Sequence, residues 1–82
     1  MNDLFVATKS KRDQLLEFIL SRNFTPTHII LEWAVKNYHA RSLRDAQEMS
    51  AEGSIRRLTP EEQRFYFPLS KEGVFVRKDF KS

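Results

Sequence analysis

The sequence contains no cysteine, only two glycines, and no apolar run long enough to span a membrane. The absence of cysteine excludes a disulfide framework and any zinc finger that uses cysteine ligands. The two glycines lie far apart, so no glycine-rich phosphate loop is present. The N-terminal residues are too polar for a signal peptide. We therefore expect a cytoplasmic protein that does not enter the membrane.

Catalytic and metal-binding patterns are also missing. His28 and His39 are the only histidines, and neither has cysteine or paired carboxylates at metal-ligand spacing. Serine, histidine and aspartate occur, but no spacing among them indicates a catalytic triad. A chain of 82 residues makes one small domain with little room for a catalytic cleft. We expect neither an enzyme nor a bound cofactor or metal.

The positive charge is modest overall but locally concentrated. The net charge is +3, yet five arginines bracket Gly53: Arg41, Arg44, Arg56, Arg57 and Arg64. Arginine is suited to bidentate contacts with phosphate or guanine. The alternative is a solvated charged surface, in which Arg41 and Arg44 pair with Asp45 and Glu48 along one helix. The acids Glu61 and Glu62 also weigh against contact with DNA.

Hydrophobic periodicity predicts three helices before Gly53. The first covers residues 10–22, with Ser10 as its N-cap and apolar side chains at helical spacing. The second covers residues 25–37, with Thr25 as N-cap, Pro26 at the first helical position, and Tyr38 as a hydrophobic anchor after its end. The third covers residues 39–52 and ends at the glycine. Its apolar stripe is thin, so we expect it to lie on the body without forming its core.

The pattern after Gly53 changes to that of strands. Residues 54–58 and 64–69 are expected to form a hairpin around a turn at residues 59–63. Residues 74–76 are expected to form a further C-terminal strand, within the chain or with a second copy. The chain is thus predicted to be one α+β domain: an N-terminal arm or short strand (1–9), a three-helix body (10–53) and a wing hairpin with a C-terminal segment (54–82).

Residues 27–55, THIILEWAVKNYHARSLRDAQEMSAEGSI, resemble the winged helix-turn-helix family in their small alanine, turn, paired arginines and terminal Gly-x-Ile. The resemblance implies a small transcriptional regulator of the phage or mobile-element type, acting as a homodimer on double-stranded DNA. The third helix would enter the major groove and the wing would lie on the backbone. The implied contacts in the groove are His39, Arg41, Ser42, Arg44 and Gln47, and those to phosphate are Arg56, Arg57 and Arg64.

A second hypothesis from the same residues is a winged-helix module that binds protein. A phage-encoded inhibitor or adaptor of a host protein would use an exposed apolar edge formed by residues 65–69 and 73–80. The acids Asp45, Glu48, Glu61 and Glu62 favour this hypothesis. The two hypotheses differ in salt dependence, because binding to DNA weakens steeply with salt and apolar docking does not.

Overall fold

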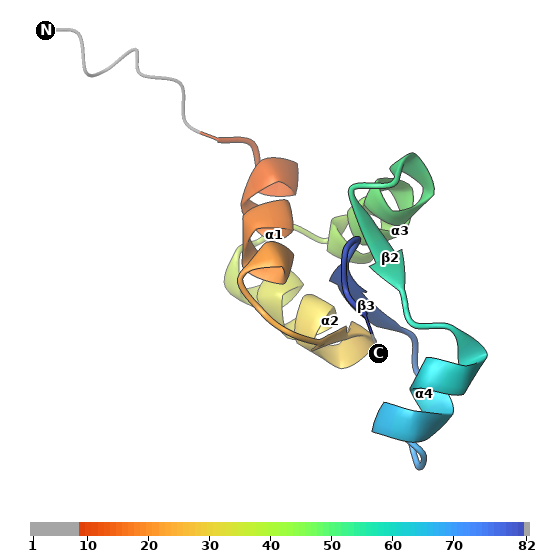
Figure 1. The fold of residues 1–82 in the computed structure, drawn as a ribbon. Helices are drawn as coiled ribbons and strands as arrows, with labels where there is room; N and C mark the ends of the chain where they lie inside the picture. Colours follow the sequence, from red (N-terminus) through yellow and green to blue (C-terminus); the bar gives the residue numbers. More distant parts are fainter. Residues whose placement is uncertain (1–8, 82) are drawn as a thin grey trace, which may run out of the picture.

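The computed structural model describes residues 9–81 and has an α+β fold (Figure 1). Its elements are, in chain order, α1 (Lys11–Leu20), β1 (Thr25–Pro26), α2 (Thr27–Lys36), α3 (Ser42–Glu52), β2 (Ile55–Arg57), α4 (Pro60–Tyr66) and β3 (Val74–Arg77). The strands form one antiparallel sheet in the order β1-β3-β2. Residues 1–8 of the predicted N-terminal arm lie outside the described part of the chain. No helix within residues 9–81 is long and apolar enough to cross a membrane.

The central strand β3 is buried on both faces, which explains its uninterrupted apolar sequence. Phe75 points into a core shared with α1, α2, α3 and β2, made of Leu15, Ile19, Ile30, Ala46, Met49 and Ile55. Val74 and Val76 point to the opposite face and pack with Leu58 and four aromatic rings, those of Phe24, Tyr66, Phe67 and Phe80. The sheet therefore separates the three-helix body from α4. The predicted third strand is confirmed, and it pairs within the chain.

The predicted second strand of the hairpin is wrong, because residues 60–66 form α4. Thr59 caps this helix: its side-chain oxygen accepts from the backbone N–H of Glu62 at 3.2 Å. The Glu62 carboxylate accepts in return from the backbone N–H of Thr59 at 2.9 Å. With Pro60 at the start of the helix, this is a complete capping box. The sequence Thr-Pro-Glu-Glu carries this capping signal, whereas the aromatic residues that follow it favour a strand.

The start of α2 also differs from the prediction. Thr25 pairs with Phe75 in the sheet, and Pro26 takes the N-cap position, so that the helix begins at Thr27. A distant segment satisfies the free N–H groups of its first turn. Thr27 N–H donates to the Gly73 carbonyl at 3.0 Å, and His28 N–H donates to the Glu72 carboxylate at 2.8 Å. The cap is therefore supplied by tertiary structure. At the start of α1, by contrast, Ser10 is the predicted local N-cap.

Two helices end in the same hydrogen-bonded turn but with different residues at its left-handed position. At the end of α3, Gly53 has φ of 88°, and Ser54 N–H donates to the Met49 carbonyl at 2.9 Å. At the end of α2, Tyr38 has φ of 51°, and His39 N–H donates to the Ala34 carbonyl at 2.9 Å. Glycine is favoured at this position because a Cβ is strained there. Tyr38 is 95% exposed, so the prediction that it anchors the turn is wrong.

Replacing Tyr38 by glycine is expected to stabilise the fold. The backbone strain is relieved, and the exposed ring contributes little packing, so the Tyr38→Gly variant should gain about 1 kcal/mol. The Gly53→Ala variant introduces the same strain and should lose about 1 kcal/mol. Urea unfolding at low protein concentration measures both. The Tyr38→Ala variant is the control, because it removes the ring and keeps the strain; stabilisation equal to that of the glycine variant would contradict the explanation.

Candidate nucleic-acid interface

Helix α3 has one buried and one exposed face. It packs on α1, α2 and β2. Its buried side chains are Ser42, Asp45, Ala46 and Met49. Ala46 and Met49 are fully buried in the main core, so the expectation that this helix stays outside the core is wrong. The other face presents Arg44, Gln47 and Ala51 to solvent, at helical spacing. The helix is thus held firmly while one polar stripe faces outward.

The N-terminal end of α3 is fixed by a buried carboxylate. Asp45 is only 2% exposed. Its Oδ2 lies 2.6 Å from Nε2 of His39, and its Oδ1 accepts from Nε of Arg41 at 3.1 Å. The ring of His39 also packs edge-on against Trp33, while the buried Ser42 hydroxyl donates to the His39 carbonyl at 2.6 Å. His39 and Ser42, both predicted to contact DNA, therefore serve to join α3 to α2.

The other predicted contacts on α3 are at its surface. Arg41 is about half exposed, and its second bond goes to the Glu48 carboxylate at 3.0 Å. The predicted pairing of Arg41 with Asp45 and Glu48 is therefore confirmed. Arg44 and Gln47 are exposed, and no side chain within residues 9–81 hydrogen-bonds to either. They are the groups of this helix that a ligand can reach without displacing a protein partner.

Arg56 has a structural role on the α4 side of the sheet. Its guanidinium forms two bonds to the Glu62 carboxylate, at 2.8 and 2.9 Å, and a third to the Phe80 carbonyl at 2.7 Å. Donating these hydrogen bonds to the Glu62 carboxylate raises the pKa of Arg56 above its ordinary value. The guanidinium also lies over the ring of Phe80. This arginine connects α4 and the C-terminal segment to β2, and its positive charge is paired with the Glu62 carboxylate.

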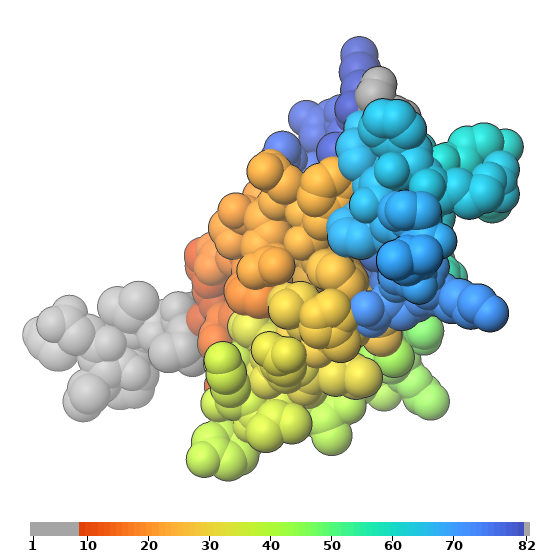
Figure 2. Space-filling model, turned by 90° about the horizontal axis from the view of Figure 1, so that it is seen from below, coloured from red at the N-terminus to blue at the C-terminus, as the bar shows by residue number. Residues whose placement is uncertain are grey.

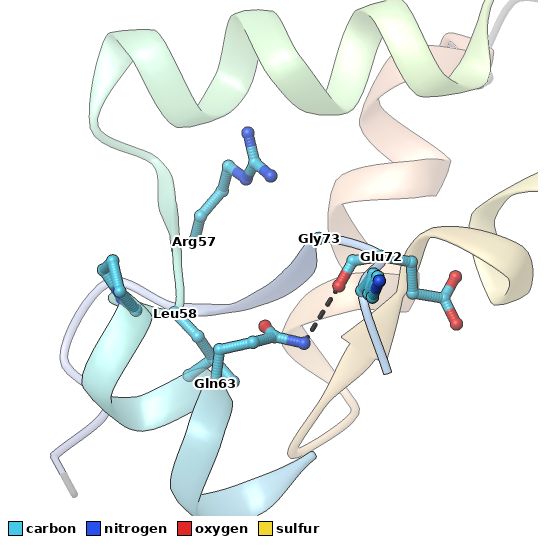
Figure 3. A pocket seen from close by; sticks show the side chains of 7 residues that line it. Arg57, Leu58, Gln63, Glu72 and Gly73 are labelled. Atoms are coloured by element: carbon cyan, nitrogen blue, oxygen red, sulfur yellow. Dashed lines mark hydrogen bonds between the residues drawn. The ribbon is translucent and has the colours of Figure 1, made fainter. Parts of the chain in front are cut away.

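Arg57 points to the opposite face, as expected for neighbours on a strand. Figure 3 shows its side chain extending from β2 toward α3. The guanidinium lies 5.9 Å from the centroid of the Phe75 ring. It also packs on Gly73, where an added Cβ would lie 2.4 Å from its terminal nitrogen. Because Gly73 has no Cβ, the guanidinium of Arg57 can occupy this space.

Arg57 borders a cavity that also contains a lysine. The cavity has a volume of about 410 Å³ and is lined by Arg57, Leu58, Pro60, Gln63, Lys71, Glu72 and Gly73 (Figure 3). Within residues 9–81, no carboxylate forms an ion pair with Arg57 or Lys71. The Glu72 carboxylate instead bonds to the ring and backbone of His28, whose hydrogen bond lowers the pKa of Glu72. The cavity thus presents two cationic side chains that an anion could contact. Lys71 and Gly73 line it, although neither was among the contacts predicted from the sequence.

The predicted contacts consequently do not form one surface. Arg44, Gln47 and Arg57 lie on the side of the sheet that carries α3. Arg64 is exposed on α4, which covers the other side.

The described residues contain no group of three histidine or carboxylate side chains that could hold a metal ion. Searches against family models, curated proteins and solved structures find no match to this chain.

Proposed function

We propose that this chain is a double-stranded DNA-binding protein of the winged helix-turn-helix type, a small transcriptional regulator of the phage or mobile-element kind. The main support for the proposal is the way α3 is packed and which of its side chains are exposed. The helix packs on three elements and buries its acid Asp45, while Arg44 and Gln47 face outward without a partner in the described chain. Burial of Asp45 removes one acid from the surface that would meet phosphate, while Glu48 stays partly exposed.

The chemistry of the exposed stripe suits the major groove. An α-helix fits this groove, where a guanidinium bonds the two acceptors of guanine and a side-chain amide bonds adenine. Arg44 and Gln47 supply one group of each kind from adjacent turns. Arg41 adds positive charge one turn earlier, although Glu48 offsets part of it. In this proposal His39, Ser42 and Asp45 orient the helix and do not touch bases.

Apart from α4, the order of the elements is compatible with the proposed winged helix. Helices α2 and α3 follow one another across a tight turn, and β2 and β3 are antiparallel neighbours after α3. In the proposed winged helix these two strands are the wing, and α4 stands where a simple wing has only a loop. Arg57, which extends toward α3, and Lys71 then supply the phosphate contacts, because they line one cavity and lack ion-pair partners within residues 9–81.

A salt series tests this function. A labelled duplex of about 20 base pairs with mixed sequence should bind with micromolar affinity at about 50 mM salt. If Arg44, Arg57 and Lys71 neutralise about three phosphates, raising the salt fourfold should weaken binding by about 40-fold. Fluorescence anisotropy measures both values. Binding no better than millimolar at the lower salt concentration would reject the proposal.

A protein partner is the second candidate, because two large apolar side chains are exposed, one on α4 and one just after it. Phe65 is 76% exposed and Leu69 is 99% exposed. They belong to the apolar segment that the sequence singled out for docking to a host protein. Binding of this kind is driven by apolar burial and persists at high salt, so the same salt series separates it from binding to DNA.

A further inference from the structure

The outer face of α2 carries an unpartnered apolar stripe. Leu31 is 49% exposed, Val35 is 76% exposed and Tyr38, just after the helix, is 95% exposed. Leu31 and Val35 are one helical turn apart on the same face, and Tyr38 lines the same hollow as Val35. The turn between α2 and α3 (lime in Figure 2) projects at the lower edge of the molecule, away from α4 (cyan). This stripe is therefore separate from the apolar residues beside α4.

The turn after α2 holds its tyrosine outward in a strained conformation. Tyr38 occupies the left-handed region at φ of 51°, and its ring stacks on no aromatic ring among residues 9–81. Beside it lies a hollow of about 310 Å³, lined by Ala34, Val35, Tyr38, His39 and Ala40. The projecting ring and the hollow together offer a site for an apolar side chain of another molecule.

Two side chains of opposite charge, Glu32 and Lys36, flank the stripe. Glu32 and Lys36 are exposed and form no ion pair within residues 9–81. When two antiparallel copies of α2 meet near Val35, Glu32 of each copy lies against Lys36 of the other. The same arrangement places Leu31 of each copy against Tyr38 of the other. In a parallel arrangement, Glu32 of one copy and Lys36 of the other would lie on opposite sides of the interface and would not pair.

We propose that α2 packs antiparallel against α2 of a second copy of this chain, around a two-fold axis near Val35. One axis satisfies the apolar contacts and both charge pairs, as an isologous interface requires. Leu31 of one copy enters the hollow beside Tyr38 of the other. A helix of ten residues is about 15 Å long, so the interface is small and the dimer should be concentration-dependent. The proposal does not rest on DNA binding.

Charge reversal with rescue tests the register. Sedimentation velocity of the unmodified chain should show a shift from monomer to dimer as concentration rises. The Glu32→Lys and Lys36→Glu variants should each weaken this dimer about tenfold, because like charges then face each other. The double variant with both changes restores complementarity and should recover the original affinity. An unmodified chain that stays monomeric at millimolar concentration, or a double variant without recovery, overturns the proposal.

Cysteine cross-linking tests the position of the axis. The chain has no cysteine, so a single introduced thiol reports one contact. Val35→Cys places it near the proposed axis, and Phe65→Cys is a matched control, since both side chains are 76% exposed. Under mild oxidation, disulfide-linked dimer should form at least tenfold faster for the first variant. Equal rates for the two variants, or no cross-linking at Val35, would overturn the proposal.

Discussion

The Arg44→Ala variant is expected to bind duplex DNA about tenfold more weakly than the unmodified chain, at constant salt. A bidentate contact to guanine contributes about 1 to 3 kcal/mol, and loss of one phosphate-attracting charge acts in the same direction. Arg44→Glu should lower the affinity further, by about a hundredfold in total, because a carboxylate then faces the phosphates. Arg44 is exposed, and no described side chain bonds to it, so the fold should be unaffected. Anisotropy titration with a preferred duplex measures the affinities, and circular dichroism checks the fold.

Arg64→Ala is the matched control for this prediction. Both arginines are exposed, and neither side chain forms a hydrogen bond or ion pair with another residue in 9–81. Both substitutions remove one positive charge. They differ in position, because Arg64 lies on α4 across the sheet from α3. Arg64→Ala should change affinity less than twofold. Equal losses for the two variants would mean that net charge, and not a surface centred on α3, determines binding.

Local signals predicted those parts of the fold whose hydrogen bonds are local. Ser10 caps α1 through the N–H of Asp13, three residues away, and Gly53 ends α3 within its own turn. The start of α2 was misplaced because its N–H groups bond to residues 72 and 73, beyond the range of any local pattern. Residues 64–67 were misassigned for a related reason. The rings of Tyr66 and Phe67 pack on the sheet from the end of α4, and alternation alone does not reveal this.

The candidate site shows the same division between local and tertiary information. Alternation along a strand is enough to place Arg56 and Arg57 on opposite sides of the sheet. Which one remains available depends on Glu62 and Phe80, which reach Arg56 from α4 and the C-terminal segment. Ser42 and Arg44 are equally polar in the sequence, yet only the packing of α3 on α2 shows that Ser42 is fully buried. Residue type indicated the chemistry, and burial determined which residues can perform it.

Asp45→Ala is expected to cause the largest loss of stability among these variants. The carboxylate is 2% exposed and accepts from both His39 and Arg41, so its removal leaves two donors without their partner. Breaking such a buried network should cost about 2 to 3 kcal/mol. Asp45→Asn keeps the shape and one acceptor, so its loss should be smaller. Urea unfolding gives the free energies of unfolding.

Glu48→Ala provides the comparison, because Glu48 also accepts from Arg41 but is 45% exposed. A surface pair contributes little, and this variant should stay within about 0.5 kcal/mol of the unmodified chain. Similar losses at the two positions would show that burial of Asp45 is not what fixes α3. If the difference holds, one acid performs two tasks, since it joins α3 to α2 and keeps its own negative charge away from the surface proposed to meet DNA. Asp45→Ala should then weaken DNA binding by misplacing Arg44, although Asp45 itself touches no nucleotide.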